Sequence, residues 1–506
     1  MATGTGMGTA TATAMGMMSA SLPPSEIQPR RIRSKGGFAR WSTRVVAVML
    51  LPAVATAGDW KVTDDIALTS TYVDRTGADA QSGLVLELSP RWRVSGKGGR
   101  FTANANYSPT LAHGFGSTDP KTLSHQLLAT SRLEAVKNEV FIGAEAAARL
   151  TGDSSTSGPV DPINFNNDNG QQSFSLRVLP EFRRHLNRYA DVVSRNAVDV
   201  VTYSGGDSDS SKSVNVNLSL ISGRYFGRTD WSLDTNYRET RYADRTDTNK
   251  NVGGTVGYRI DRKWRVFAST GYENNDVQTD RNDASGVTWD VGADWTPNSR
   301  TSVSAKYGSR YFGDSWSGSV SHRSKRTRLG LDFSRSVENR RNQQLVDSFF
   351  FLVDQDGNVV TDPVTGAPII ANIPQLNETD EDYINSQLRG ILTVTGRRTT
   401  ASVTGSIAQR DYEVSGNGED SYDLNARLTR QLGSGYSGSL GASLRHTERD
   451  SGSGSDSYDV SFSLSKTFSR RTSASLTYSY RDDNYDESNG DYTERRLGLT
   501  LRANLL

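Results

Sequence analysis

The chain of 506 residues contains no cysteine and no apolar run long enough for a membrane-spanning helix. The absence of cysteine excludes a disulfide framework and thiolate metal sites. The apolar segment 45–57 has thirteen residues, whereas a spanning helix needs roughly 18 or more. The formal net charge is +1, from 58 basic and 57 acidic residues that are interleaved along the chain, so no nucleic-acid partner is expected.

The composition is polar, with a mean hydropathy of -0.58. Disordered chains share this polarity, but they contain few aromatic and β-branched residues. This chain has 8 Trp, 20 Tyr and 16 Phe, mostly at alternate positions. The combination indicates a folded protein whose apolar residues are spaced out along the chain rather than clustered.

Residues 30–57 have the three-part layout of a secretory signal peptide. A basic stretch is followed by a short apolar segment, which ends in Ala-Thr-Ala. Small residues in this place are typical of a cleavage site. We therefore predict a leader and signal peptide over residues 1–57 and a single exported domain over residues 58–506. The alternative is an ordinary N-terminal core segment.

Beyond the signal peptide, apolar residues recur at every second position, and the pattern is interrupted at Gly, Asn, Asp or Ser. Between residues 422 and 428, for example, Tyr422, Leu424, Ala426 and Leu428 alternate with polar residues. A period of two predicts strands with one apolar face and one polar face.

The connections between these strands are alternately short and long, for example residues 396–398 and 481–495. Short turns on one side and long loops on the other are typical of a transmembrane β-barrel, which pairs all its backbone groups in lipid. We predict an all-β protein, an antiparallel barrel of about 22 strands (18 to 24) of the bacterial outer-membrane type. The alternation is weaker between residues 122 and 203. The alternative is a soluble β-sandwich or β-solenoid of a secreted adhesin.

The polar faces of the predicted strands carry charges of both signs. In a water-filled lumen these groups would hydrogen-bond hydrophilic solutes, and their mixed signs predict weak ion selectivity. The alternative is cross-strand salt bridging that holds the barrel together. The lumen-facing candidates are Asp234, Arg238, Arg259, Asp290, Asp294, Lys306, Arg328, Asp332, Arg389, Asp423 and Arg427.

Aromatic residues gather toward the predicted strand ends. Girdles of Trp and Tyr occupy the two membrane interfaces of outer-membrane barrels. This pattern predicts that outer-membrane lipid and lipopolysaccharide surround the protein. The girdle candidates are Trp264, Trp295, Trp316, Tyr307, Tyr436 and Tyr478.

The longest predicted connection, residues 339–383, contains the dipeptide Asp356-Gly357, which favours a surface hairpin. A loop that folds into the lumen is the alternative. The five histidines are scattered, without a nucleophile elbow or the spacing of metal ligands, so we expect no enzyme activity, metal or cofactor. His322 and His446 fall on lipid-facing positions.

Three motifs lie between residues 295 and 341. They are a Trp-x-Pro turn at Trp295 followed by Arg-Thr, the segment Tyr-Gly-x-Arg-Tyr-Phe-Gly at Tyr307, and the strand start Ser-His-Arg-x-x-Arg-Thr at Ser321. Together they resemble a family of outer-membrane β-barrels associated with the PEP-CTERM/exosortase exopolysaccharide systems of Gram-negative bacteria. The resemblance implies an outer-membrane location and a role near polysaccharide production or export, without assigned catalytic residues.

The sequence thus predicts an outer-membrane channel or export conduit for exopolysaccharide or another hydrophilic solute. A structural or adhesive barrel, whose extracellular loops bind surface polymer, is the alternative. The chain ends in Leu506, and Gly498, Leu501 and Ala503 keep the spacing of a barrel-assembly signal. The expected partners are the barrel-assembly machinery, a polysaccharide and its export machinery.

Overall fold

The computed structural model describes the chain between residues 58 and 505, with gaps. The predicted leader and signal peptide lie outside the described residues, as does the dipeptide Asp356-Gly357. No helix within the described part of the chain is long and apolar enough to cross a membrane. The described residues are 58–152, 160–164, 170–205, 208–277, 279, 283–339, 341, 381–450, 452, 454–486 and 490–505.

The described residues form 22 strands, in agreement with the predicted number. They are β1 (Asp59–Gly77), β2 (Gln81–Gly98), β3 (Phe101–Gly116), β4 (Leu123–Val136), β5 (Val140–Gly152), β6 (Gly170–His185), β7 (Ala190–Ser204), β8 (Ser211–Ser222), β9 (Thr229–Arg241), β10 (Thr246–Arg259), β11 (Trp264–Asp276), β12 (Ser285–Asn298), β13 (Thr301–Arg310), β14 (Gly313–Arg323), β15 (Thr327–Glu338), β16 (Tyr383–Thr395), β17 (Thr399–Tyr412), β18 (Gly418–Gly433), β19 (Tyr436–Arg449), β20 (Gly454–Thr467), β21 (Thr472–Tyr485) and β22 (Tyr492–Asn504).

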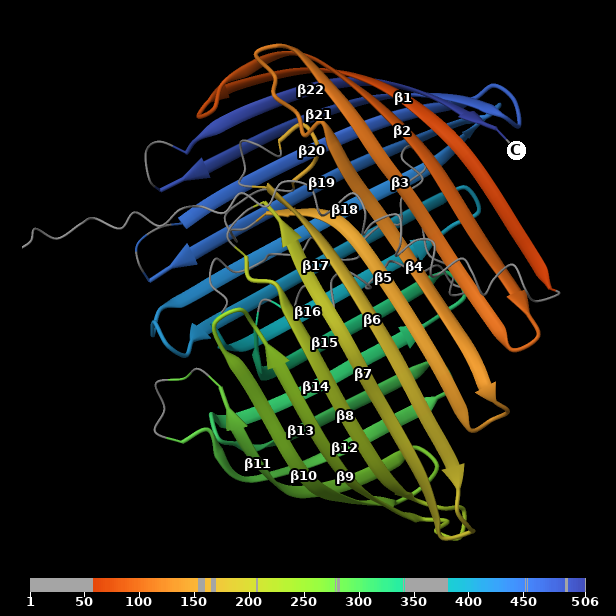
Figure 1. Cartoon of the computed structure of the whole chain (residues 1–506), viewed down its shortest axis with the longest axis vertical. Coiled ribbons are helices and arrows are strands. Elements are labelled where there is room, and N and C mark those ends of the chain that lie inside the picture. The colour runs from red at the N-terminus through yellow and green to blue at the C-terminus, as the bar shows by residue number, and fades with distance from the viewer. Residues whose placement is uncertain are drawn as a thin grey trace, which may run out of the picture. The chain divides into compact units, whose positions relative to one another are not determined.

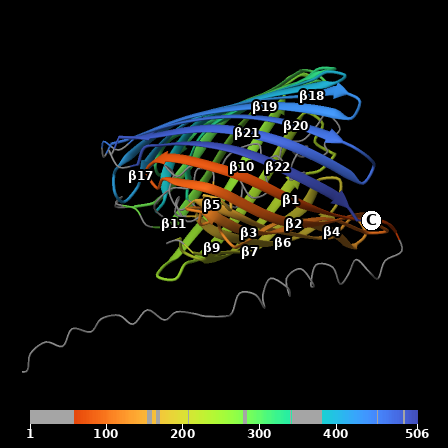
Figure 2. The same ribbon diagram turned by 90° about the horizontal axis from the view of Figure 1, so that it is seen from above.

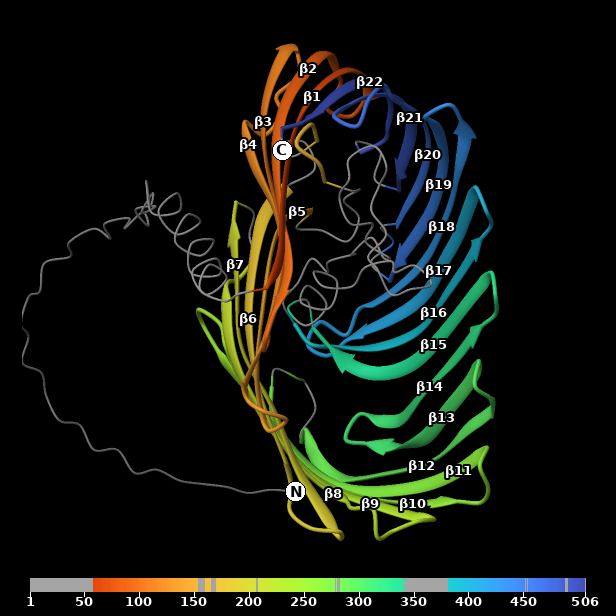
Figure 3. The same cartoon turned by 90° about the vertical axis from the view of Figure 1, so that its right-hand side faces the viewer.

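Each strand pairs antiparallel with the next one along the chain, and β1 also pairs with β22, so the sheet closes into a barrel. The strands lie side by side in Figure 1 and follow one another in chain order around a ring in Figure 3. Figure 2 shows β18–β21 on one side of the barrel and β6, β7 and β9 on the other. A closed sheet has no free edge, so both sides of every strand find backbone partners. The predicted antiparallel barrel is confirmed.

The apolar face of each strand points away from the barrel interior. The register aligns Leu88, Leu68 and Leu501 across β2, β1 and β22, and all three are exposed. The residues that follow Leu68 and precede Leu501 face inward, where the Thr69 and Thr500 hydroxyls lie 3.0 Å apart. A soluble sandwich would bury its leucines between two sheets, so that alternative is wrong. The exposed apolar belt is the surface that a barrel presents to lipid.

The two ends of the barrel differ in their connections. The short-turn end carries turns such as residues 99–100 and 299–300, together with the start of β1 and the end of β22. The long-connection end carries the connections 153–169 and 339–382. In outer-membrane barrels the short turns face the periplasm and the longer loops face outward.

One predicted long loop is mostly strand. The sequence predicts a connection over residues 481–495, but β21 continues to Tyr485 and β22 begins at Tyr492. The outward positions there, such as Asp482, are polar, so this part of the wall stands in water above the apolar belt. The strands continue beyond the belt because the hydrogen bonds between antiparallel backbones do not depend on contact with lipid.

The weak alternation around residues 189–201 has a structural explanation. The outward face of β7 carries Ser194 and Asn196 between Val192 and Val198. The Ser194 hydroxyl donates to Asn196 Oδ1 at 3.2 Å, and the backbone N–H of Asn217 on β8 donates to the same oxygen at 3.3 Å. These polar groups satisfy one another, which makes their outward position tolerable.

Candidate functional site

The candidate site is the inner wall of the barrel. The register of each strand pair places all eleven predicted lumen-facing residues opposite to the apolar belt. Asp290 and Asp294 of β12 lie beside Ser269 and Arg265 of β11. The part of the eleven residues in solute passage stays a prediction. The other nine positions are Asp234 and Arg238 on β9, Arg259 on β10, Lys306 on β13, Arg328 and Asp332 on β15, Arg389 on β16, and Asp423 and Arg427 on β18.

Some of these charges brace the wall, as the salt-bridge alternative expects. The Arg265 guanidinium donates to Asp294 at 2.8 Å and, through Nε, to Asp230 of β9 at 2.9 Å. Asp423 accepts from Arg445 of β19 at 3.0 Å and from the Ser406 hydroxyl at 3.3 Å. The bracing function therefore applies to Asp294 and Asp423.

Other inward groups present hydroxyls and charges to the interior. Asp234 accepts from the hydroxyls of Ser219 and Ser232, at 2.5 and 2.7 Å. On β19 and β20, inward serines form cross-strand pairs, with Ser439 and Ser463 2.7 Å apart. Such a wall can exchange hydrogen bonds with water and with polyhydroxylated solutes.

Exposure of the inner wall changes along the barrel axis. Near the long-connection end, inward residues are buried: Thr447 is 0 % exposed and Glu273 is 1 % exposed. Near the short-turn end, the Arg195 side chain is 62 % exposed. The interior is therefore filled near the long-connection end, and it is accessible around Arg195 near the short-turn end.

Residues 160–164, from the connection between β5 and β6, contribute to this filling. Ile163 packs against Val73 and Val85, which point inward from β1 and β2. Asp161 forms an ion pair with Arg496 on the inner face of β22. Burial by itself would raise the pKa of Asp161, but the charge and hydrogen bond of Arg496 hold this pKa below its usual range.

Arg341, which follows β15, also lies in the interior. Arg341 is buried, and its guanidinium donates to the Ser211 hydroxyl at 2.8 Å and pairs with Asp199 at 3.1 Å. Both partners lie on the inward face of β7 and β8, across the barrel from β15. The beginning of the connection between β15 and β16 thus follows the lumen alternative rather than the predicted surface hairpin, whose turn lies outside the described residues.

A buried carboxyl at the same end joins the two ends of the connection between β15 and β16. Asp382 precedes β16 and accepts a hydrogen bond from the Asn339 amide at 2.9 Å. Burial, together with the nearby negative charge of Asp247, raises the pKa of Asp382 to about 7. This carboxyl therefore changes its charge near neutral pH.

The six predicted girdle residues all lie on the outward face. Trp264 stacks on Trp295 with ring centroids 5.5 Å apart at the short-turn end, and Lys466 lies 3.8 Å above the Tyr436 ring at that end. Toward the other end, Trp316 contacts Phe333. The remaining girdle candidates are Tyr307, which donates to Asp314 at 3.0 Å, and Tyr478, which lies in the middle of β21.

The position of Tyr478 differs from the expected strand end. It belongs to the outer border of the apolar belt, because only Tyr480 separates it from the outward-facing polar Asp482. The strand continues beyond this border, so the middle of β21 coincides with the edge of the belt. The closed barrel with an apolar belt bordered by aromatic residues places the protein in the bacterial outer membrane.

Among the described residues, the histidines form no catalytic arrangement. His322 bonds to Thr301 at 2.9 Å and His446 bonds to Asp456 at 2.8 Å, both on the outward face as expected. No group of three His, Asp or Glu side chains that could hold a metal ion occurs in the described part of the chain.

Sequence reasoning missed two features of the inner wall. The first is the inward fold of residues 160–164, which have no strand period to reveal their position. The second is a group of three arginines, Arg132, Arg183 and Arg195, around Glu181. The inward phase of each arginine could be read from the alternation, but their meeting depends on the register between β4, β6 and β7.

No protein-family model matches the chain, and no curated protein sequence matches it either. Among solved structures, the siderophore receptor PirA from Pseudomonas aeruginosa aligns at 11% identity and a TM-score of 0.43, covering 88% of this chain and 81% of PirA. A mutant of the ferric enterobactin receptor PfeA from the same organism aligns at 8% identity and a TM-score of 0.47, covering 88% and 80%. A loop-deletion mutant of OmpT, an outer membrane protein of Vibrio cholerae, aligns at 10% identity and a TM-score of 0.31, covering 88% and 99%. The assignment of the fold therefore rests on the strand pairing of this chain.

Proposed function

We propose that the protein is an outer-membrane conduit for a hydrophilic solute, and that this solute is an exopolysaccharide. The conduit is supported by a single observation: the inner wall of a closed 22-stranded barrel carries hydroxyls and charges of both signs. The polysaccharide is supported by the resemblance of the motifs at Trp295, Tyr307 and Ser321. It is also supported by the serine pairs of β19 and β20, since hydroxyl groups can hydrogen-bond sugars.

The filled long-connection end makes this conduit a regulated one. Asp161, within residues 160–164, and Arg341 lie in the interior, and each is held to the wall by an ion pair. Removal of one partner of such an ion pair destabilises the contact, because the other partner is left as an uncompensated charge. Passage of a polymer therefore requires that residues 160–164 and Arg341 leave their places in the interior.

The filled end also favours the second candidate, a structural or adhesive barrel. If the interior never opens, the connections at the long-connection end remain as the working surface, and they would bind surface polymer. Under either proposal the barrel-assembly machinery inserts the chain and lipopolysaccharide surrounds it. Under the first proposal the conduit also works beside polysaccharide-export machinery. No enzymatic step is proposed.

Planar-bilayer recording on the refolded full chain separates the two candidates. We expect a small steady conductance for the wild type and a several-fold larger one for the double variant Asp161→Ala, Arg341→Ala, because both positions lose their ion pairs with the wall. The matched control is Arg335→Ala, which removes an arginine from the outward face at the same end. Silence of all three proteins, together with binding of polymer to intact cells, would establish the adhesive candidate and refute the conduit.

A further inference from the structure

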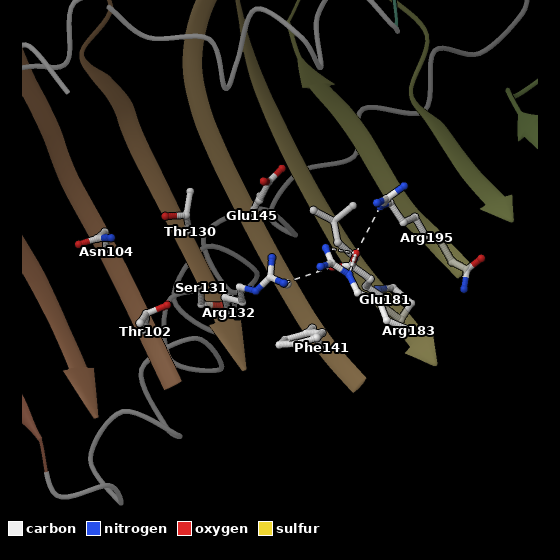
Figure 4. Close-up of a pocket in the computed structure, with 14 residues that line it drawn as sticks. Thr102, Asn104, Thr130, Ser131, Arg132, Phe141, Glu145, Glu181, Arg183 and Arg195 are labelled. Atoms are coloured by element: carbon white, nitrogen blue, oxygen red, sulfur yellow. Dashed lines mark hydrogen bonds and ion pairs between the residues drawn. The ribbon is translucent and has the colours of Figure 1, made fainter. Parts of the chain in front are cut away.

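A hollow of about 510 Å³ lies in the inner wall near the short-turn end, over β3 to β7 (Figure 4). Its volume falls within the roughly 300 to 1,000 Å³ of typical ligand sites. Arg132, Arg183 and Arg195 line it together with Glu181 and Phe141. We call these five residues the arginine cluster. The conduit does not by itself require such a concentration of one charge.

The charges of the arginine cluster are unbalanced. Three guanidinium groups share the single carboxylate of Glu181, with contacts of 3.2 Å from Arg132, 2.5 Å from Arg183 and 3.3 Å from Arg195. The other carboxylate that lines the hollow, Glu145, faces a different arginine, Arg177, at 4.0 Å. The cluster therefore carries a net positive charge toward the interior.

The guanidinium groups are positioned to receive a ligand. The Glu181 side chain is 13 % exposed, whereas those of Arg132, Arg183 and Arg195 are 53, 48 and 62 % exposed. Each guanidinium has five N–H donors, and the contacts with Glu181 use one donor of Arg132 and one of Arg195. Glu181 does not use the remaining donors of these two side chains, and both side chains line the hollow.

An aromatic ring and neutral polar groups complete the hollow. The guanidinium carbons of Arg132 and Arg183 lie 4.6 and 5.7 Å from the centre of the Phe141 ring. Such cation–π contacts restrain the orientation of the two arginines. Thr102, Asn104 and Thr130 extend the lining with hydroxyl and amide groups.

We propose that the arginine cluster binds carboxylate-bearing sugars, such as the uronic acids of an anionic polysaccharide, at the short-turn end of the lumen. A guanidinium fork matches a planar carboxylate through two parallel hydrogen bonds, and the neighbouring hydroxyl and amide groups match sugar hydroxyls. The inference rests on the proposed conduit, since it names the class of solute that meets this wall when it enters from the periplasm.

The test is calorimetric titration of the refolded full chain in detergent with trigalacturonate. We expect trigalacturonate to bind at least tenfold more tightly than maltotriose, a neutral sugar of the same length. Arg132→Gln and Arg195→Gln should each weaken this binding by about tenfold, the usual effect of losing a hydrogen bond between charged groups. The control Arg397→Gln removes a positive charge from the turn between β16 and β17 at the same end, and it should bind as the wild type does.

Further ligands separate a sugar site from a general anion site. Equal affinity for inorganic phosphate or triglutamate would overturn the assignment to sugars, and equal affinity for maltotriose would overturn the role of the charges. Wild-type affinity in both glutamine variants, shown to be folded by circular dichroism, would overturn the site. Binding of trigalacturonate by a barrel that never conducts would refute the conduit and leave the site standing, whereas conductance without such binding would do the reverse.

Discussion

Arg265 illustrates how one inward side chain can serve the wall and the lumen together. Its guanidinium joins Asp230 of β9 to Asp294 of β12, so the link crosses three strand boundaries. All three side chains remain partly exposed to the interior. Partly solvated ion pairs contribute little stability, typically 1 kcal/mol or less. Their larger effect is to set the orientation of the charges that a passing solute meets.

Asp382 has a different role, because its environment makes it sensitive to pH. Its pKa is raised to about 7 by burial first and by the charge of Asp247 second. The neutral carboxyl thus suits the folded state, and its stabilising contribution is complete below the ordinary pKa near 4 and is lost as the pH rises through 7. We expect the thermal unfolding temperature of the wild type in detergent to fall between pH 5 and pH 8.

The matched variant is Asp382→Asn, which keeps a neutral polar group beside Asn339 and cannot ionise. Its unfolding temperature should fall less over the same pH interval, so the difference between the two proteins should grow toward high pH. A parallel pH dependence of the two proteins would show that Asp382 does not sense pH.

A single strand of this barrel has two faces that lie in different solvents. On β20, Val460 points outward between Ala442 and Tyr480, and the next residue, Ser461, points inward between Gly441 and Ser479. A change of register by one residue would exchange these two faces along the entire strand. The closing pair of β1 and β22 therefore depends on every register around the ring.

The two faces of β20 should respond differently to the same substitution. Leu464→Arg places a charge in lipid beside Leu476 of β21, away from the border of the apolar belt at Tyr478, and should lower the free energy of unfolding by about 2 to 4 kcal/mol. Ser461→Arg places the charge in the lumen and should cost less than about 1 kcal/mol. Denaturant titration of folding into lipid vesicles measures both. A larger loss for Ser461→Arg would contradict the assignment of the faces.

The barrel combines a filled end, an accessible end and a nearly balanced interior. Of the eleven predicted lumen-facing residues, five are acidic and six are basic. Two of the acidic ones, Asp294 and Asp423, are paired with arginines that are not among the eleven. The positive arginine cluster occupies one sector of the wall near the short-turn end, rather than a ring around the lumen, so ions can pass it at a distance.

This charge balance predicts weak ion selectivity of the opened conduit. We expect the double variant Asp161→Ala, Arg341→Ala to show a reversal potential close to zero in a potassium chloride gradient, because neither sign of charge dominates the wall. The measurement uses the same planar bilayers as the conductance test. A potential close to the limit for a single permeant ion would contradict the balanced interior.

The period of two was sufficient to predict the class of fold, the two faces and the number of strands. Side chains alternate along any extended strand, so residues such as Leu424, Val460 and Leu499 reveal their face without knowledge of their neighbours. The same rule assigned the inward phase of Asp234 and Lys306. The strand ends were predicted less well, since pairing continues beyond the apolar belt in β21 and β22.

The local pattern of residues along the chain, read alone, therefore determines a closed outer-membrane barrel with a polar interior, because alternation and the need to pair every backbone group in lipid are local requirements. Tertiary structure alone decides what occupies that interior. Asp161 meets Arg496, Arg341 meets Asp199, and three arginines meet at Glu181 because strand register and inward-folded connections bring distant residues together. Sequence periodicity contains no information about those distances.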